Sequence, residues 1–128
     1  MKWIAFVLLF LSTSACAVEW TRIREIDTYV VYVDLATIRK TGSTATMWTL
    51  FDYKQAQHVR GTTHLSMIVQ GEFDCSEAQQ TRRLYLVFYS ENMQGGNVVW
   101  SGQGDRKWEP MVPGTTGESL WQFLCKLP

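Results

Sequence analysis

The sequence has few of the residues that build metal or catalytic sites. It contains two histidines and three cysteines in 128 residues. His58 and His64 stand six positions apart with no third ligand nearby, whereas metal sites bring closer or more numerous ligands. No glycine-rich loop opens a helix, which argues against a phosphate-binding loop. We therefore expect no metal, no cofactor and no enzymatic activity.

An excess of charge of one sign is missing as well. The chain has 12 basic and 12 acidic side chains, so nothing in its charge favours nucleic acid or an anionic membrane as a partner. No linker rich in proline, glycine or serine divides the chain, and there are only three prolines. The longest apolar run, residues 3–11, is too short to cross a bilayer. The mature protein is predicted to be one domain without a transmembrane span.

The first 17 residues are typical of an export signal. Lys2 supplies a positive start, the apolar run follows, and Ala15-Cys16-Ala17 has the small residues of a cleavage site. We expect a signal peptide at 1–17 and a mature domain at 18–128, exported to the periplasm or the bacterial cell surface. Lipidation of Cys16 is the less favoured alternative, because Thr13 stands where lipoprotein signals usually carry leucine.

Most of the mature chain has the pattern of β-strands. Apolar and polar residues alternate in residues 63–73 and 82–90, and residues 28–34 are rich in β-branched and aromatic side chains. In residues 82–90, Leu84, Leu86 and Phe88 fall opposite Arg83 and Tyr85. Six strands are predicted, at residues 19–26, 28–34, 44–53, 63–73, 82–90 and 98–101. We expect Pro110 and Pro113 to end the sheet.

The C-terminal segment predicts a short helix. Thr115 and Glu118 have the spacing of a capping box. Apolar residues follow at helical spacing and form one stripe: Leu120, Phe123, Leu124 and Leu127. A helix of this length is marginal alone in water, so it must pack on the sheet. The fold class predicted is α+β, an antiparallel sheet of about six strands with this helix packed on it and one disulfide.

Cys75 and Cys125 are predicted to form the disulfide, because thiols oxidise outside the cytosol. Cys75 follows a strand and Cys125 lies beside the apolar stripe of the helix. The bond would close a loop worth roughly 4 kcal/mol of chain entropy. The alternative is a reactive Cys75 thiol with a histidine as its base.

Aromatic residues mark the best candidate for a binding surface. Trp48 and Trp121 are expected in the core. Trp100 and Trp108 bracket a polar stretch with glycines and the basic pair Arg106-Lys107, and tryptophan is common at binding hot spots. We take this segment as the candidate binding loop, the alternative being an ordinary packed loop. The candidate binding residues are Trp100, Arg106, Lys107 and Trp108.

The chain resembles the surface-adhesin protein E family in a series of short blocks. In order they are Tyr32-Val33-Asp34, Thr37-Ile38, Trp48, Asp52-Tyr53, Phe73-Asp74-Cys75, Tyr89-Ser90, Trp108 with Pro110, Pro113-Gly114 and Cys125. The resemblance covers about Trp20 to Cys125. It implies a small exported bacterial domain, an antiparallel sheet whose C-terminal helix is tied by one disulfide. It also implies adhesion, through binding of host extracellular-matrix and serum proteins.

We therefore expect a non-enzymatic binding protein with a protein partner. The alternative is a periplasmic accessory or inhibitor protein, of the lysozyme-inhibitor kind, that inserts an exposed loop into its partner's cleft. A more distant alternative is a small hydrolase that assembles the carboxylates Asp52, Glu72 and Asp74.

Overall fold

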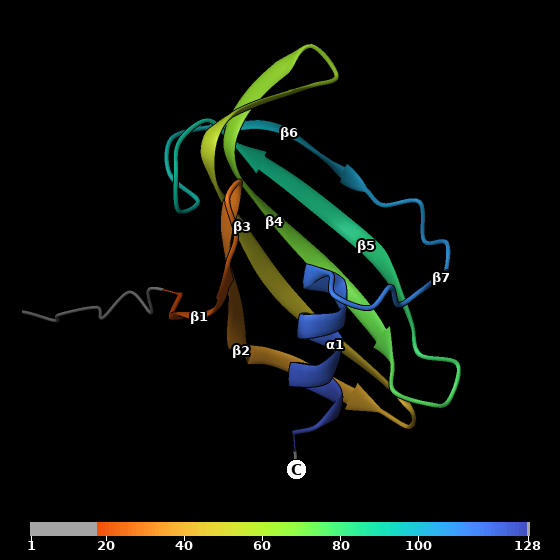
Figure 1. Ribbon diagram of the computed structural model, residues 1–128. Coiled ribbons are helices and arrows are strands. Elements are labelled where there is room, and N and C mark those ends of the chain that lie inside the picture. Colours follow the sequence, from red (N-terminus) through yellow and green to blue (C-terminus); the bar gives the residue numbers. More distant parts are fainter. Residues whose placement is uncertain (1–17, 128) are drawn as a thin grey trace, which may run out of the picture.

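The computed structural model describes residues 18–127, and the predicted signal peptide lies outside these residues. The described chain is a seven-stranded antiparallel sheet with one helix laid across it (Figure 1). The elements in order are β1 Trp20–Glu25, β2 Tyr29–Thr41, β3 Thr44–Val59, β4 Thr62–Asp74, β5 Gln80–Tyr89, β6 Val98–Gln103, β7 Glu109–Pro110 and α1 Thr116–Cys125.

The strands form a meander in which each pairs with the next, from β1 to β6. β5 pairs with β6 through residues 85–89 and with β7 through Gln80 and Thr81. Because β4 occupies the other edge of β5, β7 must continue the edge that β6 leaves. The chain between β6 and β7 therefore runs along the border of the sheet, as Figure 1 shows.

The predicted fold class is wrong in strand count and in emphasis. Residues 18–127 are mostly antiparallel sheet, with seven strands rather than about six and a single ten-residue helix, so α+β overstates the helical part. The seventh strand contains Pro110, which we expected to stop the sheet. Proline lacks an N–H donor but is tolerated in an edge strand, and two residues are too few for a recognisable alternation.

Two strands also extend further than the sequence indicated. β2 runs to Thr41 and β3 to Val59, where strand ends were predicted at 34 and 53. In these extensions most side chains are exposed on both faces. The hydrophobic alternation that reveals a strand is therefore missing there, although the backbone pairing continues.

The helix begins as the sequence predicted. Thr115 is the N-cap, and its hydroxyl accepts a hydrogen bond from the backbone N–H of Glu118. The Glu118 side chain reaches back to the N–H of Gly114, one residue before the position of the standard capping box. Leu120 and Leu124 are buried, while Phe123 and Leu127 pack at the margin of the same core.

The core lies between α1 and one face of the sheet, called here the helix-side face. Its buried residues from the sheet come from β2, β3 and β4, and the helix adds two leucines: Val31, Val33, Ala45, Met47, Phe73, Leu120 and Leu124. A second cluster of Val69, Leu86 and Phe88 continues the core toward β6.

Of the two tryptophans expected in the core, Trp121 packs against the first cluster. Trp48 does not, because it pairs across the sheet with Asp34 and Gln70 on the opposite face, where it contacts Tyr85 edge to face.

The predicted disulfide is confirmed. Cys75, one residue after β4, is bonded to Cys125 at the end of α1, with their Cα atoms 5.4 Å apart and a sequence separation of 50. The bond holds the last turn of the helix to the end of a central strand. It also disposes of the alternative of a reactive Cys75 thiol, because both sulfurs are used.

Candidate binding cleft

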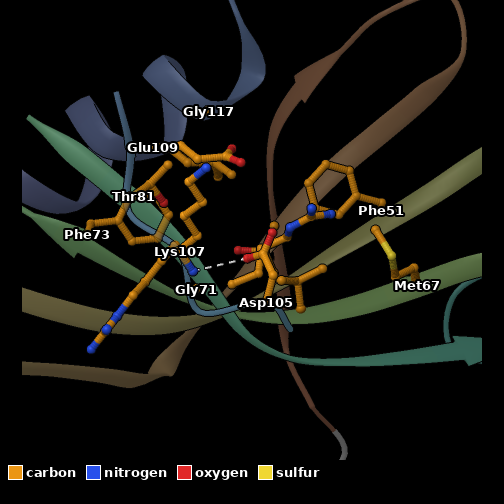
Figure 2. A pocket seen from close by; sticks show the side chains of 14 residues that line it. Phe51, Met67, Gly71, Phe73, Thr81, Asp105, Lys107, Glu109 and Gly117 are labelled. Atoms are coloured by element: carbon orange, nitrogen blue, oxygen red, sulfur yellow. Dashed lines mark hydrogen bonds between the residues drawn. The ribbon is translucent and has the colours of Figure 1, made fainter. Parts of the chain in front are cut away.

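A cleft of about 200 Å³ opens on the helix-side face, between α1 and the segment that joins β6 to β7 (Figure 2). Its floor comes from β3 and β4: Thr49, Phe51, Met67, Val69, Gly71 and Phe73. Gly117 and Leu120 of α1 line one side. Asp105 and Lys107 line it from the connecting segment, Glu109 lines it from β7, and residues 81–83 line it from β5.

A β-bulge in β5 brings a positive charge to this cleft. Gln70 pairs with Tyr85, but the next residue of β4, Gly71, pairs with Arg83, so Leu84 is left without a partner. In a regular strand Arg83 and Tyr85 would share a face; the extra residue moves Arg83 to the face of Gly71 and Val69. Bulges commonly re-aim a side chain in this way.

The bulge is covered by a close backbone contact. The N–H of Gly104 donates a hydrogen bond of 3.0 Å to the carbonyl oxygen of Leu84. A Cβ at position 104 would overlap the carbonyl oxygen of Arg83, so only glycine allows the chain to approach β5 at this distance. Immediately afterwards the chain turns into the cleft-lining residues 105–109.

Arg83 carries an unbalanced charge. The side-chain ion pairs among residues 18–127 are Arg22–Glu25, Lys54–Glu25 and Arg82–Glu72, and none of them uses Arg83. Its guanidinium is close enough to Tyr53 to lower the pKa of that phenol. Burial and the neighbouring Tyr29 outweigh this effect and raise the pKa of Tyr53 to about 12.

The two acids of the cleft differ in their surroundings. The Asp105 carboxylate accepts the backbone N–H of Lys107 at 3.2 Å (Figure 2), which fixes the turn between them. Glu109 lies in β7 opposite Thr81 and is exposed. Lys107 is also exposed and takes part in none of the ion pairs named above. Charges of both signs therefore stand around an apolar floor.

The four candidate binding residues lie in different surroundings. Lys107 lines the cleft. Arg106, beside it, is exposed, has a backbone φ of 58° and is not among the lining residues. Trp108 is half-buried, with the guanidinium of Arg82 4.4 Å from its ring centre. Trp100 packs against the second core cluster, where it contacts Phe88 and lies under Arg60.

Arg82 fixes the segment between β6 and β7, which forms one wall of the cleft. It pairs with Glu72 across the strands at 2.6 Å and covers the Trp108 ring at the same time. The desolvated face of an indole attracts a guanidinium, so one side chain ties the connecting segment to β5. The wall is thus anchored on both sides of Lys107, at Gly104 and at Trp108.

The histidines and carboxylates considered for catalysis do not converge. Within residues 18–127 no group of three or more His, Cys, Asp or Glu side chains is placed to hold a metal ion. His58 contacts Thr63, whereas His64 is 2% exposed and stacks on Phe88.

Each carboxylate proposed for a hydrolase has its own structural contact: Asp52 with the 92–93 loop, Glu72 with Arg82, and Asp74 with Ser76. The bond from Ser76 lowers the pKa of Asp74.

Sequence reasoning missed Arg83 and Gly71 as cleft residues. The alternation in residues 82–90 places Arg83 on the polar face, and only the bulge moves it. Gly71 lies in the middle of a strand, where a glycine often marks a bulge or a close approach. A Cβ there would meet the Phe73 ring at 3.0 Å. That strand glycine is the one signal in the sequence that could have drawn attention to this position.

Three crystal structures of Haemophilus influenzae protein E share the fold. Crystal form II matches with a TM-score of 0.63 at 14% identity, over 80% of this chain and 91% of that one. The selenomethionine form gives 0.61 at 14%, over 80% and 89%. A third gives 0.60 at 13%, over 83% and 92%.

A comparison with curated protein sequences finds no significant match. No helix in residues 18–127 has the length and apolar character needed to span a membrane. The family model described as surface-adhesin protein E matches residues 20–126, which is almost the whole described domain. The resemblance in the sequence blocks is thereby confirmed, and the chain belongs to the surface-adhesin protein E family.

Proposed function

We propose that this chain is an exported, non-enzymatic binding protein of the adhesin type, whose partner is a protein. The observation that carries the proposal is the family match over residues 20–126. The disulfide supports export, because such bonds persist in oxidising compartments. We further propose that the protein works at the bacterial cell surface or in the periplasm, and that residues 1–17 are its signal peptide.

The binding face, in this proposal, is the cleft together with the segment from Trp100 to Trp108. Two features support it. The segment borders an apolar hollow that charged side chains surround, and it is held in place at Gly104 and Trp108. A fixed wall loses little conformational entropy on binding. Arg106 and Lys107 both extend from it as exposed cations.

For the partner we propose a host extracellular-matrix or serum protein. The test is binding of the oxidised mature protein, residues 18–128, to immobilised basement-membrane extract, to serum proteins and to a bacterial periplasmic extract. Retention of a matrix or serum protein, lost when Lys107 and Trp108 are both changed to alanine, is the expected result. Retention of one periplasmic enzyme and no host protein would contradict the adhesin proposal and favour a periplasmic inhibitor.

Location is tested on the full chain expressed in a bacterium. Antibody labelling of intact cells should detect the protein if it reaches the surface, whereas a periplasmic protein is labelled only after the outer membrane is opened. The intact mass of the exported protein separates cleavage after Ala17 from retention of a lipidated Cys16. A protein that keeps residues 1–17 would contradict the signal-peptide proposal.

A further inference from the structure

The volume of the cleft indicates the size of its occupant. Sites for whole small molecules or cofactors enclose roughly 300–1,000 Å³, and this cleft measures about 200 Å³. It is therefore suited to one large side chain. Protein interfaces are commonly anchored by one aromatic or aliphatic side chain inserted into such a pocket.

The floor has the chemistry to hold an apolar group. Thr49, Val69 and Phe73 are buried, and Phe51 and Met67 are half-buried beside them. Gly71, between Val69 and Phe73, contributes no side chain, and the Phe73 ring lies beside it, where a Cβ would meet the ring at 3.0 Å. Methionine adapts its shape to a partner, and Phe51 offers a ring face or edge to an aromatic side chain.

The charges around the cleft decide what accompanies that apolar group. Two carboxylates, Asp105 and Glu109, line the cleft together with Arg83 and Lys107, the two lining cations that form no ion pair in the described chain, which makes the cleft a poor site for a polyanion. Asp105 is already a hydrogen-bond acceptor within its own turn. Arg83, by contrast, presents a guanidinium with no carboxylate partner in the described chain, and a guanidinium pairs best with one carboxylate in a two-pronged contact.

We propose that the cleft binds a segment of a partner protein in which a large apolar side chain is followed by an acidic residue. The apolar side chain occupies the floor beside Phe51, Met67 and the Phe73 ring, and its acidic neighbour pairs with Arg83. Lys107 lines the same cleft from the neighbouring segment. The proposal rests on the function proposed above and adds the kind of segment that is recognised.

The test uses the oxidised mature protein and a short blocked peptide, acetyl-Gly-Ser-Phe-Glu-Ser-Gly-amide, titrated at neutral pH and followed by ¹⁵N–¹H NMR. Saturable shifts are expected at the amides of Val69, Gly71 and Lys107. The peptides with alanine for phenylalanine, and with glutamine or lysine for glutamate, should bind more weakly. Stronger binding of the lysine peptide would overturn the proposal, because Asp105 and Glu109 would then select the ligand.

Three variants locate the charge contact. Arg83→Gln should weaken binding of the glutamate peptide by about threefold to tenfold. Arg83→Lys keeps the positive charge and should weaken this binding by less. Arg39→Gln is the matched control: an exposed arginine of β2 that lies outside both the cleft and the segment from Trp100 to Trp108. An equal loss of binding in R39Q and R83Q, or no saturable shift in the wild-type protein, would overturn the proposal. Unchanged NMR peaks in β1 and β2 show that each variant is folded.

The two proposals fail in different ways. If the wild-type protein captures a host partner and R83Q captures it equally well, the cleft proposal is wrong and the adhesin proposal stands. If the peptide binds as described but no host protein is captured, the cleft proposal stands and the adhesin proposal is wrong.

Discussion

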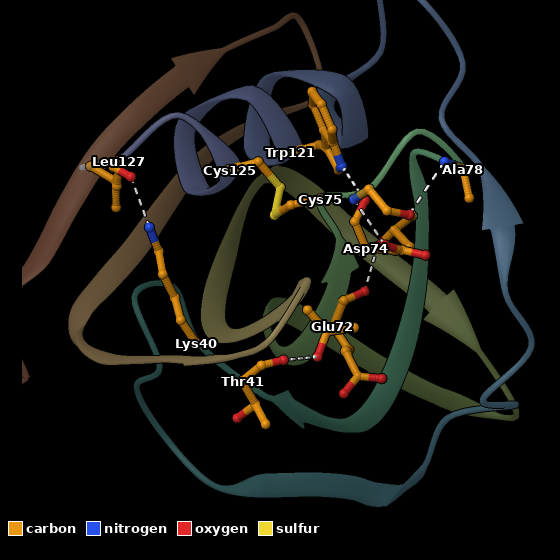
Figure 3. The surroundings of a disulfide bond; sticks show 12 residues. Lys40, Thr41, Glu72, Asp74, Cys75, Ala78, Trp121, Cys125 and Leu127 are labelled. Carbon is orange, nitrogen blue, oxygen red and sulfur yellow. Dashed lines mark hydrogen bonds between the residues drawn. A yellow bond between two sulfur atoms is a disulfide. The ribbon is translucent and has the colours of Figure 1, made fainter.

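The indole Nε1 of Trp121 donates a hydrogen bond of 2.7 Å to the carbonyl oxygen of Asp74, the residue before Cys75 (Figure 3). The same turn of α1 leads to Cys125, which is bonded to Cys75. Two residues after the helix ends at Cys125, Leu127 accepts a hydrogen bond of 2.8 Å at its carbonyl oxygen from Lys40 of β2. The helix is thus held at the end of β4 by one covalent and one polar contact, and the residues that follow it are held to β2 by a third.

Removing the disulfide should lower stability markedly. The bond closes a loop between cysteines separated by 50 in sequence, which corresponds to about 4 kcal/mol of chain entropy. For a domain of this size the Cys75→Ser/Cys125→Ser variant should melt more than about 10 °C lower. Calorimetry of the wild-type protein with reductant should reproduce that shift, and the variant should not respond to reductant. A wild-type melting curve unaffected by full reduction would contradict the prediction.

Trp121→Phe should lower the free energy of unfolding by less than removal of the disulfide does, because phenylalanine keeps an aromatic ring and only one hydrogen bond is lost. A typical net contribution is about 0.5–1.5 kcal/mol. Urea unfolding followed by circular dichroism measures it. In a double-mutant cycle with the cysteine pair the two effects should not add, because both contacts hold the same turn of α1 to β4. Strict additivity would mean that the two contacts act independently.

Stability should fall as the pH drops below about 6.5, because of His64. Its ring is 2% exposed, and its Nδ1 has no hydrogen-bond partner in the described chain. Burial, followed by the charge of His58, lowers the pKa of His64. The unfolded chain therefore takes up a proton first as the pH falls. Stability is lost from the unfolded pKa down to the folded one, at no more than about 1.4 kcal/mol per pH unit.

His64→Phe isolates this effect. Phenylalanine keeps the stacking on Phe88, where the two rings lie 4.1 Å apart, and removes the unsatisfied nitrogen. The urea midpoint of the variant should change less than that of the wild-type protein between pH 7.5 and pH 5.5. His58→Phe is the control, because His58 is exposed and its change should leave most of the slope. Equal slopes in wild-type and H64F proteins would refute the assignment.

The parts of the fold predicted correctly depend on local signals. The helix follows from its cap at Thr115 and from the spacing of Leu120 and Leu124. The disulfide follows from two cysteines left in an exported domain. The strand extensions beyond 34 and 53 were missed because they are stabilised by pairing with neighbours rather than by burial of one face. That pairing is tertiary information, which alternation does not carry.

The cleft required information that the sequence does not display. A single extra residue, Leu84, changes the face of Arg83, and nothing in the alternation of residues 82–90 marks it. Lys107 was singled out because it lies between two tryptophans, but those tryptophans pack in separate places. The spacing of residues along the loop therefore identified one lining residue of the cleft, Lys107. The other unpaired cation, Arg83, is placed there by the register between β4 and β5, which the sequence does not reveal.

Two glycine substitutions should have opposite effects. Gly104→Ala places a Cβ against the Arg83 carbonyl oxygen, and backbone cannot move aside as a flexible side chain can. We expect a loss of about 1–3 kcal/mol and a displaced bulge. Gly117→Ala adds a Cβ in the first turn of α1, where the nearest atoms, on Met111 and Thr115, are 3.6 Å away. Alanine favours helix there by up to about 1 kcal/mol.

Urea unfolding measures both stabilities, and the NMR peak of Arg83 reports the position of the bulge. G104A should shift the peaks of Arg83 and Leu84, whereas G117A should leave them in place and raise the urea midpoint. Gly104 donates a hydrogen bond to Leu84 in β5, next to Arg83. G104A should therefore also weaken binding of the glutamate peptide, even when the protein remains folded. A fully stable G104A protein with unshifted Arg83 peaks would show that β5 keeps its bulge without the close approach of Gly104.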